Sequence, residues 1–188
     1  MRTADPILTG GRDQRSQPAT AGHPSTPVQA SPQVVILAAG MGTRLGRKLP
    51  KPLTPLMDGR SIMGQQLDGI RAVFGADTPV TAVVGYRAKA VMRAQPDLLF
   101  AFNPDFATTN TSQSLLRALR SSQAGGVLWL NGDVVFDPAV LDHAAPLIAA
   151  DESFVCVDTS TVADEEVKYT LDEQGFICLL YTSDAADE

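Results

Sequence analysis

The sequence predicts an α/β fold, a Rossmann-like three-layer sandwich with a mostly parallel sheet. Short apolar runs rich in β-branched residues alternate along the chain with longer amphipathic segments. The first of these runs leads directly into a glycine-rich loop. This alternation is typical of parallel strands joined by helices that cover the sheet. The chain has 188 residues, of which 44% are hydrophobic, and this is enough for one domain with a sizeable core.

The predicted elements begin at Val34, where the apolar pattern starts abruptly. Strands are expected at the apolar, β-branched or aromatic runs Val34–Ala38, Val80–Val84, Leu98–Phe102, Val127–Leu130, Phe154–Val157 and Val167–Leu171. Helices are expected between them, at Ile62–Phe74, Ala88–Ala94, Ser112–Ser121 and Pro138–Ala149. The last two helices have apolar residues at helical spacing, namely Leu115, Leu116 and Leu119, and Leu141, Ala145 and Ile148.

Both ends of the chain fall outside the predicted domain, residues 33–177. Residues 1–32 are rich in Pro, Ser, Thr, Gly, Gln and Arg, so they cannot bury enough apolar surface to offset the entropy of ordering. We expect a disordered extension, which a mis-assigned start codon would explain equally well. Residues 178–188 (CLLYTSDAADE) resemble a translated sequencing-library adapter. The domain is then C-terminally truncated near Ile177; the alternative is an ordinary strand with an acidic tail.

Composition excludes several partners. The formal net charge of -6 and the pI of about 4.8 give no overall attraction to nucleic acid or to an anionic membrane. No apolar run approaches the roughly 18–20 residues that span a bilayer, and residues 1–10 lack the apolar segment of a secretory signal. We therefore expect a cytoplasmic protein with no nucleic-acid or membrane partner, in which any anion-binding site is local.

The strongest local signal is the segment VVILAAGMGTRLGRKLPKPL, residues 34–53. Small residues from Ala38 to Gly42 let backbone N–H groups approach a ligand closely. Four cations follow within a few positions of this otherwise acidic chain: Arg44, Arg47, Lys48 and Lys51. Loop and charge together predict a polyphosphate site.

Two other glycine loops fit this segment poorly. A P-loop needs a Lys-Ser or Lys-Thr pair after its last glycine, and neither Gly42 nor Gly46 is followed by one. A dinucleotide fingerprint would continue into a helix, but Gly46 comes one position late and Pro50, Pro52 and Pro55 forbid a continuous helix. A glycine-rich turn with solvated basic residues stays open as a structural explanation.

The segments LAAGMGTRL and PKPL resemble the signature of the sugar-phosphate and choline-phosphate nucleotidyltransferase family. A weaker likeness continues through VVGY, FNPDF, TNTSQSL and NGDVVF, and the asparagine-serine segment is nearest the choline-phosphate cytidylyltransferase branch. The resemblance implies a magnesium-dependent enzyme. It would transfer a nucleoside monophosphate from a triphosphate, with CTP favoured, to a phosphocholine-like or sugar phosphate and release pyrophosphate.

The resemblance also implies roles for the loop residues. Base and ribose would lie against Leu37, Ala39 and Gly40, and the β- and γ-phosphates would be held by Gly42, Thr43 and Arg44. The α-phosphate would contact Lys51. Attack on the α-phosphorus adds charge to its oxygens, so a fixed ammonium stabilises the transition state more than the ground state.

Further polar residues have both a predicted ligand-binding role and a structural alternative. By the resemblance, Asn110, Ser112 and Ser114 would contact the base, although capping of the following helix by Thr111 or Ser112 explains the segment without a ligand. The resemblance aims Lys168 at the acceptor phosphate, and a solvated strand lysine is the alternative.

Asp133 is the predicted metal ligand. It follows the strand Val127–Leu130, which places its carboxylate at the carboxyl edge of a parallel sheet, where α/β proteins bind ligands. Magnesium is usually held by one or two carboxylates together with phosphate oxygens and water. A second metal-binding aspartate is expected beyond the truncation, and an aspartate that merely opens a turn is the structural alternative.

Two rival functions remain. A regulatory nucleotide-binding domain would keep the site without catalysis. A dinucleotide-dependent oxidoreductase would need an acidic ribose ligand that ends a second strand about 20 residues after the glycines. Asp58 has that spacing, but a proline-rich loop surrounds it.

Overall fold

The computed structural model describes residues 32–41, 49–157 and 168–181. It divides into two compact units, which are described separately: Val28–Leu141, and Asp142–Glu188 with Met1–Pro27. The elements are, in order, β1 (Gln33–Ala38), η2 (Lys51–Leu53), α1 (Ile62–Phe74), β2 (Val80–Val84), α2 (Ala88–Ala94), β3 (Leu99–Phe102), α3 (Thr111–Leu119), β4 (Val127–Asn131), α4 (Ala139–Ala149), β5 (Lys168–Leu171) and β6 (Ile177–Tyr181).

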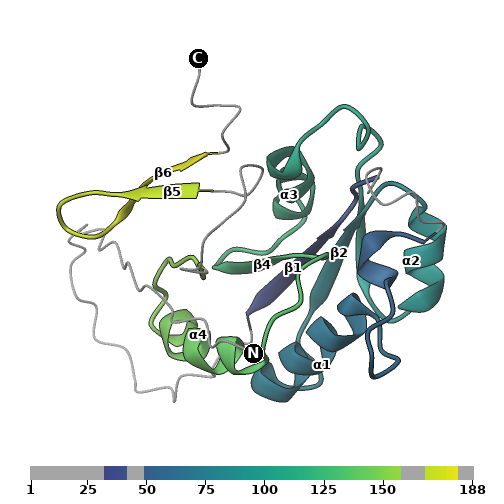
Figure 1. Ribbon diagram of the computed structural model, residues 1–188, viewed down its shortest axis with the longest axis horizontal. Coiled ribbons are helices and arrows are strands. Elements are labelled where there is room, and N and C mark those ends of the chain that lie inside the picture. The colour runs from purple at the N-terminus through teal and green to yellow at the C-terminus, as the bar shows by residue number, and fades with distance from the viewer. Residues whose placement is uncertain (1–31, 42–48, 158–167, 182–188) are drawn as a thin grey trace. The chain divides into compact units, whose positions relative to one another are not determined.

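The first unit is built on a parallel sheet whose strand order is β3-β2-β1-β4 (Figure 1). The chain forms β1, β2 and β3 outward in one direction and then returns to the other side of β1 for β4. The register pairs Leu37 of β1 with both Val83 of β2 and Asn131 of β4. The strand order therefore reverses at β1, which is where open α/β sheets bind ligands.

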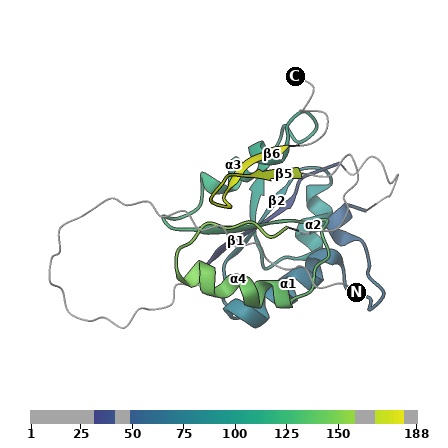
Figure 2. The same ribbon diagram turned by 60° about the vertical axis from the view of Figure 1, so that its left-hand side comes forward.

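Helices cover both faces of this sheet, as the three-layer prediction requires (Figure 2). On one face, Val34 and Ile36 of β1 belong to a buried cluster with Met63 and Leu67 of α1, and Val91 of α2 lies in the same cluster. On the other face, alternate residues of β1 pack with α3. Because β1 is buried on both sides, its sequence is a continuous apolar run. The Rossmann-like α/β fold is confirmed.

Most predicted bounds agree with the observed ones. Helices α1 and α2 and strand β2 have the predicted limits, and the remaining matched elements shift by one or two residues. Helix α1 begins after Ser61, whose Oγ accepts a hydrogen bond from the Gly64 N–H at 3.0 Å, and ends at Gly75, which has a φ of 101°. These are the hydroxyl cap and the glycine stop expected of an α-helix.

The predictions differ from the structure in the second unit. Phe154–Val157 forms no strand, because an apolar run becomes a strand only beside a partner and no described strand pairs with it. Strand β5 instead pairs with β6, which was not predicted, in an antiparallel hairpin. The connecting turn is closed by Asp172, whose Oδ1 accepts hydrogen bonds from the backbone N–H groups of Gln174 and Phe176.

The hairpin also bears on the predicted C-terminal tail. Strand β6 runs from Ile177 to Tyr181 and so enters residues 178–188, for which an ordinary strand was the alternative expectation. The origin of that tail stays a prediction. The disorder expected for residues 1–31 lies outside the described residues. Within the described part of the chain, no helix is both long enough and apolar enough to cross a bilayer.

Gly85 allows the ends of β1 and β2 to approach closely. A Cβ atom at this position would lie 2.6 Å from the Phe106 Cβ and 2.9 Å from the Ala39 carbonyl oxygen. The same carbonyl accepts a hydrogen bond from the Tyr86 N–H at 3.0 Å. A side chain at residue 85 would therefore push apart the two strand ends that lead into the ligand-binding edge.

We expect Gly85→Ala to lower the free energy of unfolding by about 1–3 kcal/mol, as overpacking of a tight contact does. The measurement is urea unfolding of the variant beside the wild type. Gly40→Ala is the matched control, because a Cβ there has no neighbour within 4 Å and its stability should hardly change. Equal unfolding midpoints for the two variants would contradict the close-packing argument.

Candidate active site

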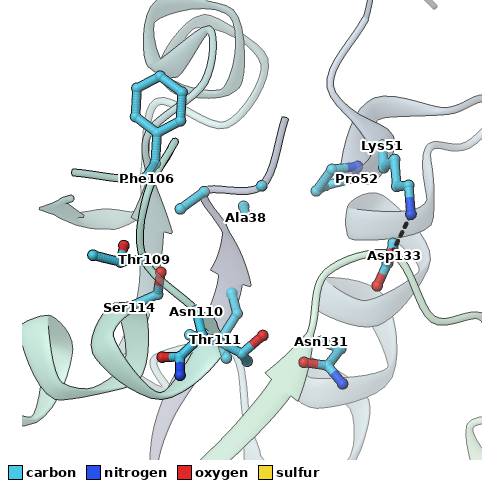
Figure 3. A pocket seen from close by; sticks show the side chains of 13 residues that line it. Ala38, Lys51, Pro52, Phe106, Thr109, Asn110, Thr111, Ser114, Asn131 and Asp133 are labelled. Atoms are coloured by element: carbon cyan, nitrogen blue, oxygen red, sulfur yellow. Dashed lines mark hydrogen bonds and ion pairs between the residues drawn. The ribbon is translucent and has the colours of Figure 1, made fainter. Parts of the chain in front are cut away.

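A pocket of about 290 Å³ lies at the carboxyl ends of β1 and β4, where the strand order reverses (Figure 3). Its walls come from the end of β1, from η2, from the segment between β3 and α3, and from the turn after β4. The lining residues are Leu37, Ala38, Ala39, Gly40, Lys51, Pro52, Phe106, Thr109, Asn110, Thr111, Ser114, Asn131 and Asp133. All of them lie in the first compact unit.

The floor of the pocket is the glycine-containing end of β1. The predicted ligands Leu37, Ala39 and Gly40 all line it, and a Cβ at Gly40 would have no atom of the described residues within 4 Å. The backbone is therefore accessible to a ligand here. The other predicted loop ligands, Gly42, Thr43 and Arg44, lie outside the described residues.

Two opposite charges meet at the pocket wall. The Lys51 Nζ donates a hydrogen bond to Asp133 Oδ2 at 3.0 Å, as the dashed line in Figure 3 shows. Lys51 opens η2 and Asp133 follows β4, so residues 82 positions apart are brought together. The two side chains are 37% and 43% exposed, and a pair this open contributes roughly 0–1 kcal/mol to stability.

Gly132 permits this meeting. Its N–H donates to the Leu37 carbonyl at 2.9 Å. A Cβ at residue 132 would lie 2.6 Å from that same oxygen and 3.1 Å from Pro52 Cγ. Only glycine fits between the end of β1 and η2. The sequence analysis used the Asn-Gly-Asp segment for its aspartate alone and missed the need for its glycine.

A buried asparagine organises the opposite wall. Asn103, directly after β3, is fully buried, and its Nδ2 donates to Thr109 Oγ1 at 3.0 Å and to Ser114 Oγ at 3.1 Å. Its Oδ1 accepts from the Asp105 N–H at 3.1 Å. The two hydroxyls that it fixes both line the pocket. Of these residues the sequence analysis considered only Ser114; the asparagine in FNPDF was the available signal for the rest.

The structure separates capping from pocket lining at the start of α3. The cap is Asn110, whose Oδ1 accepts from the Gln113 N–H at 3.2 Å, rather than Thr111 or Ser112. Asn110 also lines the pocket, and capping by the carbonyl oxygen still leaves an amide group with two donors. Ser112 is exposed and is not among the lining residues.

Lys168 is placed differently from the other predicted site residues. It opens β5, in the second unit, which is described separately from the pocket. Its role toward an acceptor phosphate stays a prediction.

Asp58, the acidic residue that the oxidoreductase alternative would need as a ribose ligand, pairs with a neighbouring side chain instead. Asp58 lies in the turn between η2 and α1 and accepts hydrogen bonds from the backbone and guanidinium of Arg60. These bonds lower the pKa of the Asp58 carboxyl below its usual value. The second strand of the sheet ends at Val84, so Asp58 does not occupy the strand-end position of a ribose ligand.

The donor set of the pocket suits a hard cation that is shared with a substrate. Asp133 is the only carboxylate among the described lining residues, and Asn131, the last residue of β4, also lines the pocket. No group of three or more His, Cys, Asp or Glu side chains that could hold a metal occurs in the described part of the chain. One carboxylate does not make a closed metal cage, but Mg²⁺ commonly binds through one or two carboxylates, substrate phosphates and water.

The comparisons with known proteins identify the family. The model of the MobA-like NTP transferase domain matches residues 34–173. This range includes β1, the pocket residues and β5. The chain belongs to the family of MobA-like NTP transferase domains.

Individual relatives support this assignment. Over 130 residues the chain is 38% identical to CMP-5'-(3-aminopropyl)phosphonate synthase of Streptomyces rubellomurinus, an alignment that covers 64% of this chain and 20% of the synthase. The chain thus spans about a fifth of the length of that curated relative. A nucleotidyl transferase structure from Methanothermobacter has 25% identity and a TM-score of 0.50, covering 84% of this chain and 74% of the other. The inositol-1-phosphate CTP transferase of T. maritima shares the fold at 16% identity, with a TM-score of 0.58 over 82% of this chain and 64% of the other.

Asn110 can be tested for its two roles separately. We expect Asn110→Asp to keep the helix cap, because a carboxylate accepts the Gln113 N–H equally well, and to weaken nucleoside triphosphate binding by about tenfold or more, because it replaces two amide donors with a charge that repels phosphate. Asn110→Ala should lower the unfolding free energy by about 1 kcal/mol.

Calorimetric titration with triphosphate and thermal unfolding of the same samples give both readouts. Ser112→Ala is the matched control, since Ser112 is exposed outside the lining. Unchanged triphosphate affinity in Asn110→Asp would leave the residue with the capping role alone.

Proposed function

We propose that this chain carries the triphosphate site of a nucleotidyltransferase. The enzyme transfers a nucleoside monophosphate from a nucleoside triphosphate, with CTP favoured, to a phosphorylated small molecule and releases pyrophosphate. The observation that carries the proposal is the convergence of Lys51 and Asp133 at 3.0 Å in a pocket beside the glycine-containing end of β1. Family membership supports the transferase class.

The charges in the pocket suit a triphosphate with a divalent cation. Lys51 offers a fixed ammonium to phosphate oxygens, and Asp133 offers an anionic oxygen to Mg²⁺. In the structure these two groups form an ion pair. A metal-triphosphate complex also carries a negative and a positive charge. Its phosphate oxygens would pair with the Lys51 ammonium and its metal ion would pair with the Asp133 carboxylate, so both side chains would find partners in one pocket.

The choice of base and acceptor rests on two supports. The asparagine-serine segment at the start of α3 resembles the choline-phosphate cytidylyltransferase branch, and the related synthase is named for a CMP-phosphonate product. We therefore favour CTP, with a phosphocholine-like compound or a sugar phosphate as acceptor. A phosphonate would offer the same anionic oxygen nucleophile.

The chemistry needs few groups from the protein. An oxygen of the acceptor phosphate attacks the α-phosphorus, the bond between that phosphorus and the bridging oxygen breaks, and pyrophosphate leaves with the electron pair. The acceptor is already an anion at neutral pH, so no general base is required and positioning dominates. Lys51 stabilises the charge that grows on the α-phosphate. Asp133 would hold Mg²⁺, which would supply positive charge to the triphosphate.

Asp133→Asn is the first test of this function. It retains the size and much of the hydrogen-bonding capacity of the side chain but removes the charge. We expect magnesium-dependent pyrophosphate release by the full-length protein to fall at least about a hundredfold, because losing a metal-held contact costs several kcal/mol in the transition state. The melting temperature should change little, since the side chain is exposed.

The matched control is Asp68→Asn, which removes an exposed, ion-paired carboxylate on α1 that does not line the pocket. Its turnover should stay near that of the wild type. Wild-type turnover in Asp133→Asn at saturating magnesium and triphosphate would sink the proposal. Intact triphosphate binding without turnover in the wild type would instead favour the regulatory nucleotide-binding domain.

Lys51→Ala tests the transition-state role of the ammonium. We expect kcat to fall by about a hundredfold with KM for the triphosphate nearly constant, because Lys51 contacts the oxygens that gain charge during attack. Lys89→Ala, which removes an exposed lysine of α2 outside the pocket, is the control. Steady-state kinetics at saturating acceptor separate the two parameters. A rise in KM alone would assign Lys51 to uniform substrate binding.

A further inference from the structure

Helix α1 carries one buried amide in an otherwise apolar face. Gln66 is 1% exposed and lies on the helix beside Met63, Leu67 and Ile70, which all belong to the main core. A buried amide is unfavourable unless its polar atoms find hydrogen-bond partners. Its buried position therefore implies that the amide makes hydrogen bonds that an apolar side chain could not make.

Both partners belong to the turn that carries Asp133. The Gln66 Nε2 donates to the Asn131 carbonyl at 2.9 Å and to the Val134 carbonyl at 2.8 Å. These carbonyls stand on either side of Gly132 and Asp133. Because only the NH₂ group can donate, two carbonyl partners also fix which way the amide faces.

Two N–H groups of the turn also have backbone partners. The Gly132 N–H donates to Leu37 of β1, and the Val134 N–H closes the turn on Asn131 at 3.3 Å. The turn is therefore tied to the sheet on one side and to α1 on the other. Asp133 lies between these anchors, and its carboxylate reaches Lys51.

The other polar atom of the Gln66 side chain argues against a role in packing alone. Its Oε1 is buried and has no hydrogen-bond partner among the described residues. An apolar side chain of similar length would fill the same space without an unpaired oxygen, so core packing alone does not account for an amide here. What the amide supplies is two donors aimed at the flanks of Asp133.

We propose that Gln66 is a positioning residue that fixes the turn Asn131–Val134, and through it the Asp133 carboxylate, for the metal-triphosphate complex. This inference rests on the proposed function. Gln66 is not among the pocket-lining residues, so it acts through the backbone of the turn. It resembles in this respect the outer-shell groups that orient metal ligands in other proteins.

The test is Gln66→Met, with Gln66→Leu as a second variant of similar volume. Each removes both donors, which destabilises the turn, and also removes the buried unpaired oxygen, which offsets part of that loss, so the melting temperature should fall only modestly. Titration of Mn²⁺ in the presence of CTP, followed by electron paramagnetic resonance of the free ion, should show affinity weakened by about 10–100-fold. Steady-state kinetics at fixed, limiting magnesium should show a lower kcat with KM for CTP within about threefold of the wild type.

Ile70→Val is the matched control, because Ile70 lies one turn further along α1 in the same core but makes no contact through a polar group. Its Mn²⁺ affinity should equal that of the wild type even where its melting temperature falls. Wild-type Mn²⁺ affinity in folded Gln66→Met and Gln66→Leu would overturn the inference. Failure of both variants to fold, with Ile70→Val intact, would overturn it as well by assigning the amide to the core.

The proposed function fails separately from this inference. If Asp133→Asn binds Mn²⁺ and CTP as the wild type does, the carboxylate is not a metal ligand and the proposed function is wrong. If Asp133→Asn loses Mn²⁺ while both Gln66 variants retain it, the function stands and only the positioning role is rejected.

Discussion

The site depends on one close approach, that of the turn after β4 to the end of β1. Gly132 makes it possible, because its N–H reaches the Leu37 carbonyl at 2.9 Å in a space that a Cβ would fill. Both strands are parallel, so their carboxyl ends meet at one edge of the sheet. The glycine-containing end of β1 and the carboxylate of Asp133 thus share a pocket. The strand order reverses at β1, and open α/β sheets bind their ligands at such a point.

Two buried amides hold the walls of this pocket. Gln66 reaches from α1 to the turn that carries Asp133, and Asn103 reaches from the end of β3 to the hydroxyls of Thr109 and Ser114. Each is nearly or fully buried, where its hydrogen bonds are shielded from competing water and strengthened by the low local dielectric. The polar loops that line the pocket are thus held in place by hydrogen bonds to side chains in the core. Preorganised groups of this kind need little rearrangement when a ligand arrives.

The sequence was sufficient to predict the parallel sheet, its helices and the edge at which Asp133 lies, because strands buried on both faces are continuous apolar runs and their carboxyl ends coincide. It was insufficient for Gln66, whose partners are 65 and 68 positions away; a polar residue in the apolar face of α1 was the only trace. It also gave the cap of α3 to Thr111 or Ser112 instead of Asn110, since neighbouring residues with short polar side chains compete and the helix register decides between them. The strand predicted at Phe154–Val157 was wrong, and β6 had been expected only as the alternative, for a related reason: pairing of a short strand depends on a partner elsewhere in the chain.

The weakness of the Lys51–Asp133 ion pair fits a site that must exchange its partners. Both side chains are more than a third exposed, so the pair contributes roughly 0–1 kcal/mol, and a ligand loses little by separating the two charges. In the proposed function, Lys51 would exchange its bond to Asp133 for a charge-assisted bond to phosphate, and Asp133 would bind a divalent cation instead. The pair nevertheless holds both groups at the pocket before the ligand binds, which a solvated lysine and a solvated aspartate would not ensure. The proposed function thus gives an acidic chain with a formal net charge of -6 a way to bind a polyanion, because the two charges are local and paired, and Asp133 is held by the turn that Gly132 and Gln66 contact.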